Sequence, residues 1–375
     1  MKIRAAILES VGLPAPYRQS RPLRILEVDL DPPQHGEVLV RIRAAGLCHS
    51  DLSVINGDRP RPVPMVLGHE AAAEVVECGA GVTDLAPGDR VVLVFIPSCG
   101  CCTLCAEGRP ALCEPGALSN NAGTLLGGGR RLNKGGTPIN HHIGVSCFAE
   151  YAVVSRHSCV KIQSDISYPE AALFGCAVLT GVGAVVNTAR LQAGSTAAIL
   201  GLGGVGFSAL LGAVASGARE IVAIDLNEEK LKLARELGAT ATFNAGHPDC
   251  AEQIREITKG GVDYAFEMAG AIPAMELAWK ITRRGGSTIS AGLPNPALRF
   301  QLPPVTLVAE ERTLRGSYIG SAVPARDIPR YIDLYQRGKL PVNRLMGAQL
   351  AFDDINEGFD RLATGHALRD VVVFK

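Results

Sequence analysis

Residues 196–206 read TAAILGLGGVG, and this stretch decides the fold of much of the chain. The apolar run 196–200 predicts a buried strand, and residues 205–216 predict a helix directly after it. Between them, glycines allow a tight turn and a close approach of the backbone to a ligand. Asp225 follows at the end of the next expected strand, 220–225. A strand, G-x-G-x-x-G, a helix and a later acidic residue are together typical of a dinucleotide-binding unit.

The glycines of this motif have separate expected roles. Gly201 allows the tight turn, Gly203 lets the backbone approach a pyrophosphate at the helix N-terminus, and Gly206 allows close helix–strand packing. Asp225 is expected to accept hydrogen bonds from the adenosine ribose. Its charge would also repel a 2′-phosphate by about 4 kcal/mol at 4 Å and an effective dielectric of 20. The motif therefore favours NAD over NADP, and a glycine-rich turn without a ligand is the alternative.

Repeated strand–helix pairs surround this motif from Pro169 onward. The helix expected after Asn227 is typical, because Asn is a favoured N-cap, Glu228 and Glu229 suit the first turn, and Gly238 favours a stop. Units of this length predict a doubly wound parallel sheet. The other expected elements are strands at 239–245, 262–268 and 286–292, and helices at 171–186, 250–259 and 273–283.

The two ends of the chain have a different pattern. Residues 36–95 contain alternating or continuous apolar runs between glycine and proline turns, which predict β-strands. Residues 116–140 are rich in glycine and asparagine and are expected to form a long loop. A helix at 326–337 and a closing strand at 370–374 are expected to return to the first domain. We therefore expect a β-rich domain of residues 1–177 and 321–375, interrupted by a dinucleotide-binding domain of residues 178–320.

The composition is that of a globular protein with no net charge. The 375 residues are 47% hydrophobic and 20% charged, which argues against disorder. Lys and Arg number 37, as do Asp and Glu, so the net charge is zero and no global field attracts nucleic acid or an anionic membrane. Glycine makes up 42 residues, or 11% of 375, against a usual value of about 7%. This excess predicts many tight turns.

Two charge-free runs, 171–189 and 191–218, raise the question of a membrane span, which needs about 20 apolar residues. The longer run contains seven glycines, so a buried strand followed by a helix explains it better. The N-terminal segment MKIRAAILES has four consecutive apolar residues, fewer than the roughly seven that a secretory signal requires. We expect a cytoplasmic protein that does not enter the membrane.

The eleven cysteines include a cluster that predicts a metal site. Cys99, Cys102, Cys105 and Cys113 have the spacing of a four-thiolate site, in a segment without apolar periodicity. Four thiolates select zinc, and a site closed by four cysteines is structural because no position is open to substrate. The even two-residue gaps favour Cys102 over Cys101, which is expected to stay outside the site. Unligated surface thiols are the alternative, disfavoured because they would oxidise.

Further metal-ligand types occur on two turns that follow strand-like segments. These are CHSD at 48–51 and GHE at 68–70. Isolated cysteine and histidine residues are more often core or surface residues than ligands. The residues themselves therefore indicate only a possible second metal site.

The order of these motifs resembles that of the zinc-dependent medium-chain alcohol dehydrogenases. The resemblance extends over nearly the whole chain, from Ala44 to Phe374, and the long segment after Cys113 is similar to that of the animal and class III (formaldehyde dehydrogenase) branch. It implies an α/β fold in which a Rossmann domain is inserted into a β-rich, GroES-like catalytic domain. The motifs are GLCHSD (46–51), LGHE (67–70), the cysteine cluster, LFGCAVLTGVG (173–183), GLGGVG (201–206) and ALRDVVVF (367–374).

The resemblance implies roles for individual residues of the catalytic domain. Cys48, His69 and Cys176 correspond to the catalytic zinc ligands, and two cysteines with one histidine are the known ligand set of this enzyme class. Asp51 corresponds to the carboxylate that orients the zinc histidine. Further catalytic positions are Glu70, an acid behind the zinc, and Ser50, the hydroxyl that takes the alcohol proton, while Phe95 and His142 fall at substrate-pocket positions.

The resemblance also implies a set of cofactor-binding residues. His49 and Arg369 correspond to positions that bind the pyrophosphate, Lys230 to one that contacts the adenosine ribose, and Thr180 and Val205 to residues packed against the nicotinamide. The complete expected set is His49, Thr180, Gly201, Gly203, Gly204, Val205, Gly206, Asp225, Lys230 and Arg369.

Two positions differ from the pattern of the family. Ser53 stands where many members carry the histidine that completes a proton relay. The glutathione-linked branch carries an arginine shortly after the fourth cysteine of the cluster, whereas here Glu114 follows and the next basic residue is Arg130.

The function implied by the resemblance is reversible hydride transfer between a primary or secondary alcohol and NAD, through an alkoxide on zinc, with two zinc ions per chain. The expected partners are an alcohol or aldehyde and a second copy of the chain, without nucleic acid or membrane. The alternative enzyme is a glutathione-dependent formaldehyde dehydrogenase. A non-catalytic dinucleotide sensor or zinc-storage protein is a further alternative, but such a protein has no use for Cys48, His69 and Cys176 together.

Overall fold

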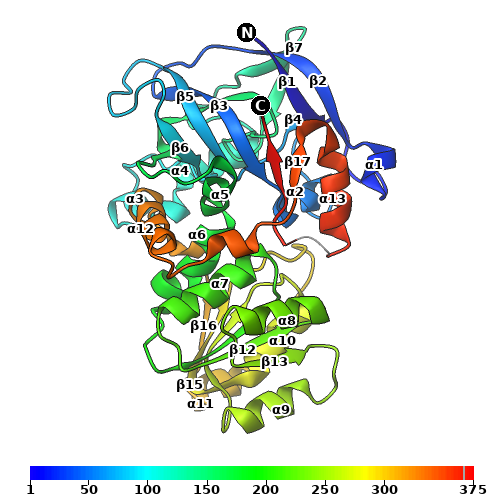
Figure 1. The fold of residues 1–375 in the computed structure, drawn as a ribbon, viewed down its shortest axis with the longest axis vertical. Helices are drawn as coiled ribbons and strands as arrows, with labels where there is room; N and C mark the ends of the chain where they lie inside the picture. The colour runs from blue at the N-terminus through cyan, green and yellow to red at the C-terminus, as the bar shows by residue number, and fades with distance from the viewer. Residues whose placement is uncertain (366–367) are drawn as a thin grey trace. The chain divides into compact units, whose positions relative to one another are not determined.

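The computed structural model describes residues 1–365 and 368–375, and the chain forms two compact units. The first unit contains Met1–Cys176, Val323–Asp333 and Met346–Lys375. The second contains Ala177–Ala322 and Leu334–Leu345. Both units appear as ribbons in Figure 1.

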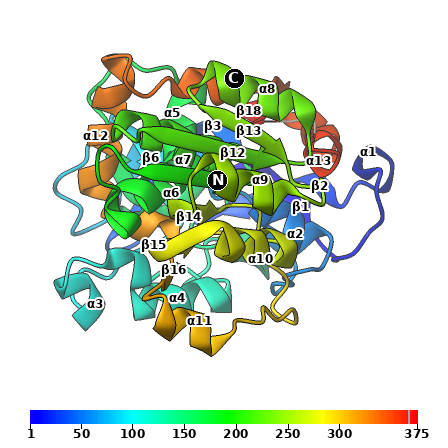
Figure 2. The same cartoon turned by 90° about the horizontal axis from the view of Figure 1, so that it is seen from below.

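The second unit is built around a parallel sheet with the strand order β13-β12-β11-β14-β15-β16. In chain order this is 3-2-1-4-5-6, the arrangement of a doubly wound dinucleotide-binding fold. The view in Figure 2 shows the strands following one another across the sheet. Their bounds are β11 Thr196–Leu200, β12 Glu220–Asp225, β13 Ala241–Asn244, β14 Val262–Glu267, β15 Thr282–Ser290 and β16 Thr313–Gly316.

Helices between these strands complete the second unit. α8 begins where Asn227 accepts the N–H groups of Glu229 and Lys230, as expected of an N-cap. α9 and α10 pack against one face of the sheet. Ile254 lies there in one apolar core with Leu200 and Ile224, which are neighbours on β11 and β12. The helices are α6 Ala177–Gly183, η4 Ala184–Ala189, α7 Gly204–Ala215, α8 Glu228–Glu236, α9 Cys250–Ile257, α10 Ile272–Ile281 and α11 Pro304–Ala309, with η5 Ile319–Ser321 and η6 Val342–Leu345.

The first unit consists of a closed barrel and an adjoining sheet. The barrel order is β1-β2-β7-β8-β4, and the sheet order is β10-β6-β5-β3-β18-β17, with β9 also paired to β3. Inward residues such as Ile7, Val28 and Ile139 form the barrel core. β18, close to the C-terminus, pairs antiparallel with β3, so the last residues belong to this unit. The strands are β1 Lys2–Leu8, β2 Leu23–Leu30, β3 Glu37–Gly46, β4 Met65–Val66, β5 Ala71–Cys78, β6 Arg90–Leu93, β7 Leu132–Lys134, β8 Thr137–His141, β9 Tyr151–Ser155, β10 Cys159–Lys161, β17 Gln349–Ala351 and β18 Val371–Val373.

Short helices connect the strands of the first unit and carry several of its candidate ligands. Cys48 and Cys113 are the N-cap residues of two of them, α2 and α4. The helices are α1 Tyr17–Ser20, α2 His49–Ile55, α3 Thr103–Ala106, η1 Pro110–Leu112, α4 Glu114–Ala122, η2 Arg156–Ser158, α5 Tyr168–Ala172, η3 Leu173–Gly175, η7 Phe352–Asp354 and α13 Ile355–Ala363, and α12 Pro324–Gln336 contains residues of both units.

The expectation of a long loop at 116–140 is wrong. Helix α4 occupies Glu114–Ala122, because the Cys113 sulfur accepts the Gly116 N–H at its start and Gly123, at a φ of 68°, ends it. Strands β7 and β8 then form a hairpin, joined by two glycines with positive φ. The glycines mark a helix end and a turn, which composition alone does not distinguish from a loop.

The single helix expected at 171–186 is also wrong. It is interrupted at Cys176, whose φ of −140° and ψ of −71° are not helical, and η4 is a π-helix. At the adjoining Gly175, any Cβ would collide with the Leu93 carbonyl oxygen, so the backbone there lies directly against β6. The break allows the Cys176 side chain to leave the path of a continuous helix.

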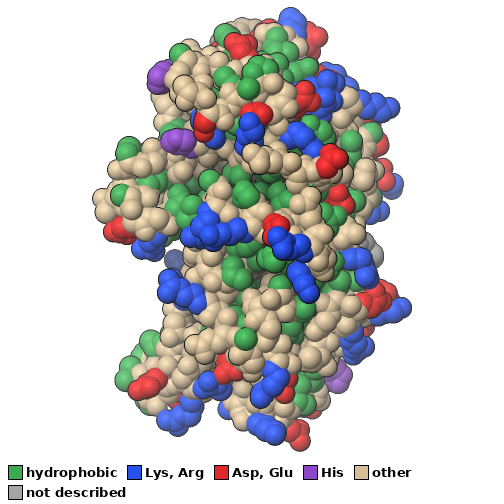
Figure 3. All heavy atoms as spheres, turned by 60° about the vertical axis from the view of Figure 1, so that its left-hand side comes forward, with side chains coloured by type: hydrophobic (Ala, Val, Ile, Leu, Met, Phe, Trp, Pro, Cys, Tyr) green, Lys and Arg blue, Asp and Glu red, His purple; other side chains and the backbone are tan. Residues whose placement is uncertain are grey.

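No single helix in the described part of the chain is long and apolar enough to span a membrane. The bent pair Tyr168–Gly175 and Ala177–Ala189, broken by 49°, passes the same test of length and composition. All residues of α6, within the second part of this pair, are buried in the protein. On the face shown in Figure 3, basic and acidic side chains are both scattered over the surface.

One segment near the C-terminus groups with a different unit from the one expected for it. Residues 321–375 were expected to belong to the β-rich domain, but Leu334–Leu345 groups with the second unit. The reason is that η6 packs against α7, and Arg344 pairs with Glu236 at 2.9 Å.

Candidate active site

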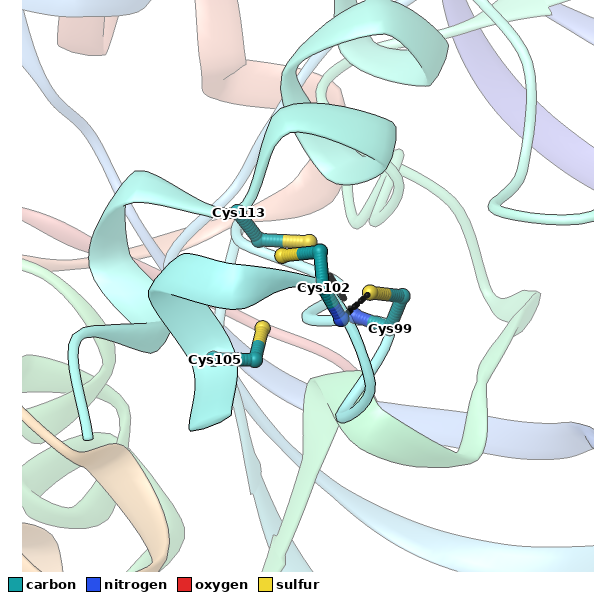
Figure 4. A group of neighbouring side chains, drawn as sticks. All are labelled: Cys99, Cys102, Cys105 and Cys113. Carbon is teal, nitrogen blue, oxygen red and sulfur yellow. Dashed lines mark hydrogen bonds between the residues drawn. The ribbon is translucent and has the colours of Figure 1, made fainter. Parts of the chain in front are cut away.

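The four cysteines of the expected structural zinc site lie together in the first unit. The sulfur atoms of Cys99, Cys102, Cys105 and Cys113 all lie within 4.8 Å of one another. Figure 4 shows them projecting from α3 and its flanking turns toward a common centre. Cys101, by contrast, is exposed, and its sulfur lies 3.8 Å from that of Cys99, outside this group.

Backbone N–H groups support this cluster of sulfurs. The Cys113 sulfur accepts from the N–H of Cys99 at 3.1 Å, and the Cys99 sulfur accepts from that of Cys102 at 3.3 Å. The N–H groups of Cys101 and Cys102 lower the pKa of Cys99 to about 6. Four sulfurs in mutual reach are the donor set of a closed, structural zinc site. The residues present therefore fit such an ion.

A second group of metal-ligand atoms belongs to Cys48, His69 and Cys176, and these atoms also lie within 4.8 Å of one another. All three residues are buried. Cys48 is the N-cap of α2, His69 lies in the turn between β4 and β5, and Cys176 lies at the helix break. Two sulfurs and an imidazole form a three-ligand set that leaves one coordination position open, as a catalytic zinc site requires.

Asp51 orients the imidazole of this second group. Its Oδ1 lies 3.1 Å from Nδ1 of His69, so Nε2 is the nitrogen that is left to face a metal. Burial by itself would raise the pKa of Asp51, but His69 and His142 lower it to about 2. Burial would likewise lower the pKa of His69, but the charges of Asp51 and Cys48 raise it to about 10. Asp51 and Cys48 thus both favour positive charge at this point of the site.

Glu70 and Arg369 form a buried ion pair beside this group. Arg369 Nε donates to Glu70 Oε1 at 2.9 Å, and its Nη2 contacts Oε2 of the same carboxylate. Only 3% of Arg369 is exposed, and its positive charge helps to lower the pKa of Cys48, after the hydrogen bond from Cys176. Glu70, the acid expected behind the zinc, therefore fixes the position of Arg369, the residue expected at the cofactor pyrophosphate.

The α2 helix presents the remaining catalytic candidates of the first unit. Ser50 is half-buried in its first turn, and its N–H donates to the Cys48 sulfur at 3.5 Å. His49 is exposed. The Ser53 hydroxyl donates to the His49 carbonyl at 2.8 Å, one helical turn back, so it satisfies the backbone rather than reaching the ligand group.

Phe95 and His142, expected at substrate positions, both contact the ring of His69. The ring centroids of Phe95 and His69 are 5.1 Å apart and those of His142 and His69 are 5.6 Å apart, both in edge-to-face arrangements. The Asn120 amide donates to the Phe95 carbonyl at 2.9 Å, which ties α4 to this wall of the site. Sequence reasoning missed Asn120, because its segment was expected to be a loop.

The glycine-rich motif of the second unit has the geometry that its roles require. Gly201 has a φ of 88°, and a Cβ there would lie 2.7 Å from the Cβ of Ala269. A Cβ on Gly206 would collide with the Gly201 carbonyl oxygen, so the helix packs directly against the turn. Gly203 has no atom of the described residues within 4 Å of a Cβ position, as a close approach by a ligand requires.

Asp225 lies beside this turn at the end of β12. Its Oδ2 accepts from the N–H of Leu202 at 2.6 Å, and its Oδ1 accepts from that of Asn227 at 2.9 Å. A carboxylate oxygen has two lone pairs, so both can still accept from a ribose. Lys230 is half-buried in the first turn of α8, close to this carboxylate in sequence.

Thr180 and Val205 lie on the helices α6 and α7. These helices touch so closely that a Cβ on Gly181 would collide with the Val205 carbonyl oxygen. Thr180 is 7% exposed. Gly204 opens α7 directly after its N-cap Gly203, so the motif and the helix N-terminus coincide.

Comparisons with known proteins show which family this chain resembles. Residues 34–164 match the alcohol dehydrogenase GroES-like domain family, and residues 204–337 match the zinc-binding dehydrogenase family. The chain is 35% identical over 384 aligned positions to S-(hydroxymethyl)glutathione dehydrogenase of Paracoccus denitrificans, with 100% of both chains covered. The chain belongs to the zinc-dependent alcohol dehydrogenase family.

Solved structures of this family share the whole fold. Benzyl alcohol dehydrogenase from Acinetobacter calcoaceticus superposes with a TM-score of 0.93 at 33% identity, with 100% of each chain covered. A zinc-binding dehydrogenase from Sinorhizobium meliloti, bound to NADP, superposes with a TM-score of 0.81 at 26% identity, again over 100% of both chains. This alcohol dehydrogenase homologue is thus an oxidoreductase with a Rossmann-type domain inserted into a GroES-like domain.

The two ligand groups predict two zinc ions that serve different ends. Replacing Cys105 with serine should leave about one zinc per chain and lower the thermal unfolding midpoint, because a structural zinc contributes folding energy. Cys101→Ser is the matched control and should keep both ions. Cys176→Ser should lose the other ion and all turnover with less effect on unfolding. Metal analysis and calorimetry test this, and a single zinc in active wild-type protein contradicts it.

Proposed function

We propose that this chain is an NAD-dependent alcohol dehydrogenase that interconverts primary or secondary alcohols with aldehydes or ketones. The observation that carries the proposal is the buried Cys48, His69 and Cys176 group, with its open fourth position and its orienting Asp51. A protein that only stored zinc or sensed a dinucleotide would not need an open site. The experiment is turnover of an alcohol panel with NAD, followed as NADH absorbance.

Each residue of the site has its own role in the proposed reaction. Cys48, His69 and Cys176 would hold a zinc ion, which would supply the Lewis acid that acidifies the proton of an alcohol. Asp51 holds the imidazole of His69 in the tautomer and direction that ligation needs. NAD supplies the hydride acceptor, and Gly203, with open space before it, lets the backbone N–H groups approach the pyrophosphate.

Ser50 is the group that we propose takes the alcohol proton. Its hydroxyl lies two residues after Cys48, in the first turn of α2, and it is half-buried. A serine passes on a proton rather than storing it, so the proton next needs a ribose hydroxyl and water. Ser53 cannot take the place of a relay histidine, because a hydroxyl does not bind a proton at neutral pH; in the structure it donates to the His49 carbonyl.

The Ser50 proposal predicts a large effect from one hydroxyl. Ser50→Ala should lower kcat/KM for alcohol oxidation by at least about 100-fold, because positioned proton transfer contributes typically 10²–10⁴-fold. Ser53→Ala, one turn further along the same helix, is the matched control and should change little. Steady-state kinetics of both variants at saturating NAD give the answer. A Ser50→Ala enzyme as active as wild type excludes this role.

The carboxylate of Asp225 is expected to determine the choice between NAD and NADP. The S. meliloti relative is bound to NADP, so the choice of cofactor in this chain needs its own test. Here, a carboxylate at the ribose end of the motif should repel a 2′-phosphate. Asp225→Ser should relax the preference for NAD by up to about 1,000-fold, the factor that corresponds to a repulsion of about 4 kcal/mol. The measurement is kcat/KM with NAD and NADP for both proteins. Equal use of the two cofactors by wild type would show that Asp225 does not select.

A glutathione-dependent formaldehyde dehydrogenase is the second candidate, favoured by the P. denitrificans relative. The segment after Cys113 carries no arginine of its own, but the fold brings two to the C-terminal end of α4. Arg61 donates to the Asn120 carbonyl at 3.3 Å and to the Asn121 side chain at 2.9 Å, and Arg130 donates to the Ala122 carbonyl at 2.9 Å. Both guanidinium groups thus already bond to protein oxygens.

We expect activity on simple alcohols to need no added glutathione. The cation that would hold a glutathione carboxylate is absent from 114–129, and Arg61 and Arg130 bond to α4 itself. The test compares benzyl alcohol, ethanol and formaldehyde as substrates with NAD, each with and without glutathione. Formaldehyde oxidation that appears only with glutathione, without activity on the two alcohols, would establish the second candidate instead.

The proposed assembly is a homodimer in the cytoplasm. β16 is the edge strand of its sheet, and all four of its residues are exposed. Close to it in sequence, Val305 and Val308 are 71% and 76% exposed on α11. Unpaired strand edges and exposed apolar side chains favour pairing with a second copy. All eleven cysteines are free thiols in the structure, which fits a reducing compartment.

A further inference from the structure

His142, expected at a substrate-pocket position, is a buried imidazole that takes part in none of the proposed proton or hydride transfers. It is 2% exposed and follows β8, and its backbone N–H donates to the Ser146 hydroxyl at 2.8 Å. That hydroxyl in turn donates to the Val66 carbonyl at 2.8 Å. Ile143 and Ser146 both have left-handed backbone, at φ values of 40° and 53°, which costs about 1–3 kcal/mol for each residue. The surrounding structure therefore holds this turn in a costly conformation.

The ring of His142 is directed at the carboxylate that orients the zinc ligand. Its Nδ1 lies 3.2 Å from Oδ1 of Asp51, the same oxygen that His69 approaches to 3.1 Å. The N–H of Gly68 reaches this oxygen too, at 3.1 Å. Oδ2 of Asp51 has no hydrogen-bond partner within residues 1–365 and 368–375. Three nitrogen atoms thus surround one carboxylate oxygen.

Nδ1 of His142 lies beside the Asp51 carboxylate and has no other hydrogen-bond partner among the described residues. An N–H on this nitrogen therefore has that carboxylate as its nearest acceptor.

We propose that His142 is a positioning residue of the zinc site, acting through Asp51. Among the residues that the structure describes, the carboxylate is held through one oxygen only, so each donor to that oxygen helps to determine its direction. The direction of Asp51 determines in turn where Nε2 of His69 points. Groups that orient a metal ligand in this way contribute typically 10–100-fold to metal affinity. This inference rests on the proposed catalytic zinc at Cys48, His69 and Cys176.

The test uses two substitutions of nearly equal shape. Asparagine places an amide close to the position of Nδ1, whereas leucine has the same branching without a donor. His142→Leu should release the catalytic zinc to a chromogenic chelator at least about 10-fold faster than wild type, and His142→Asn should stay close to wild type. Release of the four-cysteine zinc should be unchanged in both. In cobalt-substituted protein, the visible bands should shift in His142→Leu and be restored in His142→Asn.

Two other results would contradict either the role of His142 or the proposed zinc site. Equal release rates in wild type, His142→Leu and His142→Asn would overturn the role of His142 while leaving the zinc site intact. Wild-type protein that binds only the four-cysteine zinc would instead contradict the proposed function itself. If His142→Leu does not fold, His142→Gln replaces it, because its amide lies toward Nε2. His142→Gln should then release zinc as fast as expected for the leucine variant, and wild-type behaviour would count against the proposal.

Discussion

The first unit depends on holding several ionisable side chains together, away from water. Cys48, Asp51, His69, Glu70 and Arg369 are each no more than 5% exposed. Burying an unpaired charge costs several kcal/mol, so each charge here needs a partner of opposite sign. Arg369 pairs with Glu70, and Asp51 accepts from His69 and from a backbone N–H. The helices and strands of the first unit bring these oppositely charged side chains together.

The backbone contributes to the same constraint through positions where only glycine fits. A Cβ on Gly46 would collide with the Glu70 carboxylate, and one on Gly68 would lie 2.7 Å from the Cys147 sulfur. Gly175 lies as tightly against β6, next to the helix break that carries Cys176. In the second unit, Gly201 and Gly206 have this role around the dinucleotide motif. In both units, the geometry of the site therefore depends on close packing of the backbone.

A hierarchy of support extends outward from the proposed catalytic ligands. His69 is oriented by Asp51, and Asp51 is approached by His142 from a turn whose backbone is left-handed at Ile143 and Ser146. The proposed catalytic zinc would have three protein ligand atoms and would depend on such support, whereas four cysteines would close the other site by themselves. A substitution two contacts away from the metal can for this reason act on the chemistry.

The sequence by itself determined the elements whose cause is local. The strand–glycine–helix motif at 196–206, the N-cap at Asn227 and the spacing of Cys99, Cys102, Cys105 and Cys113 all lie within short segments, where propensity and covalent geometry decide the outcome. Only the tertiary structure decided what depends on distant partners. It broke the helix expected at 171–186, so that Cys176 reaches His69. It also formed α4 and a hairpin where glycine content predicted a loop, and it placed His142 beside Asp51. The physical reason is that burial and hydrogen bonding between remote segments outweigh local preference, and no pattern within one segment records them.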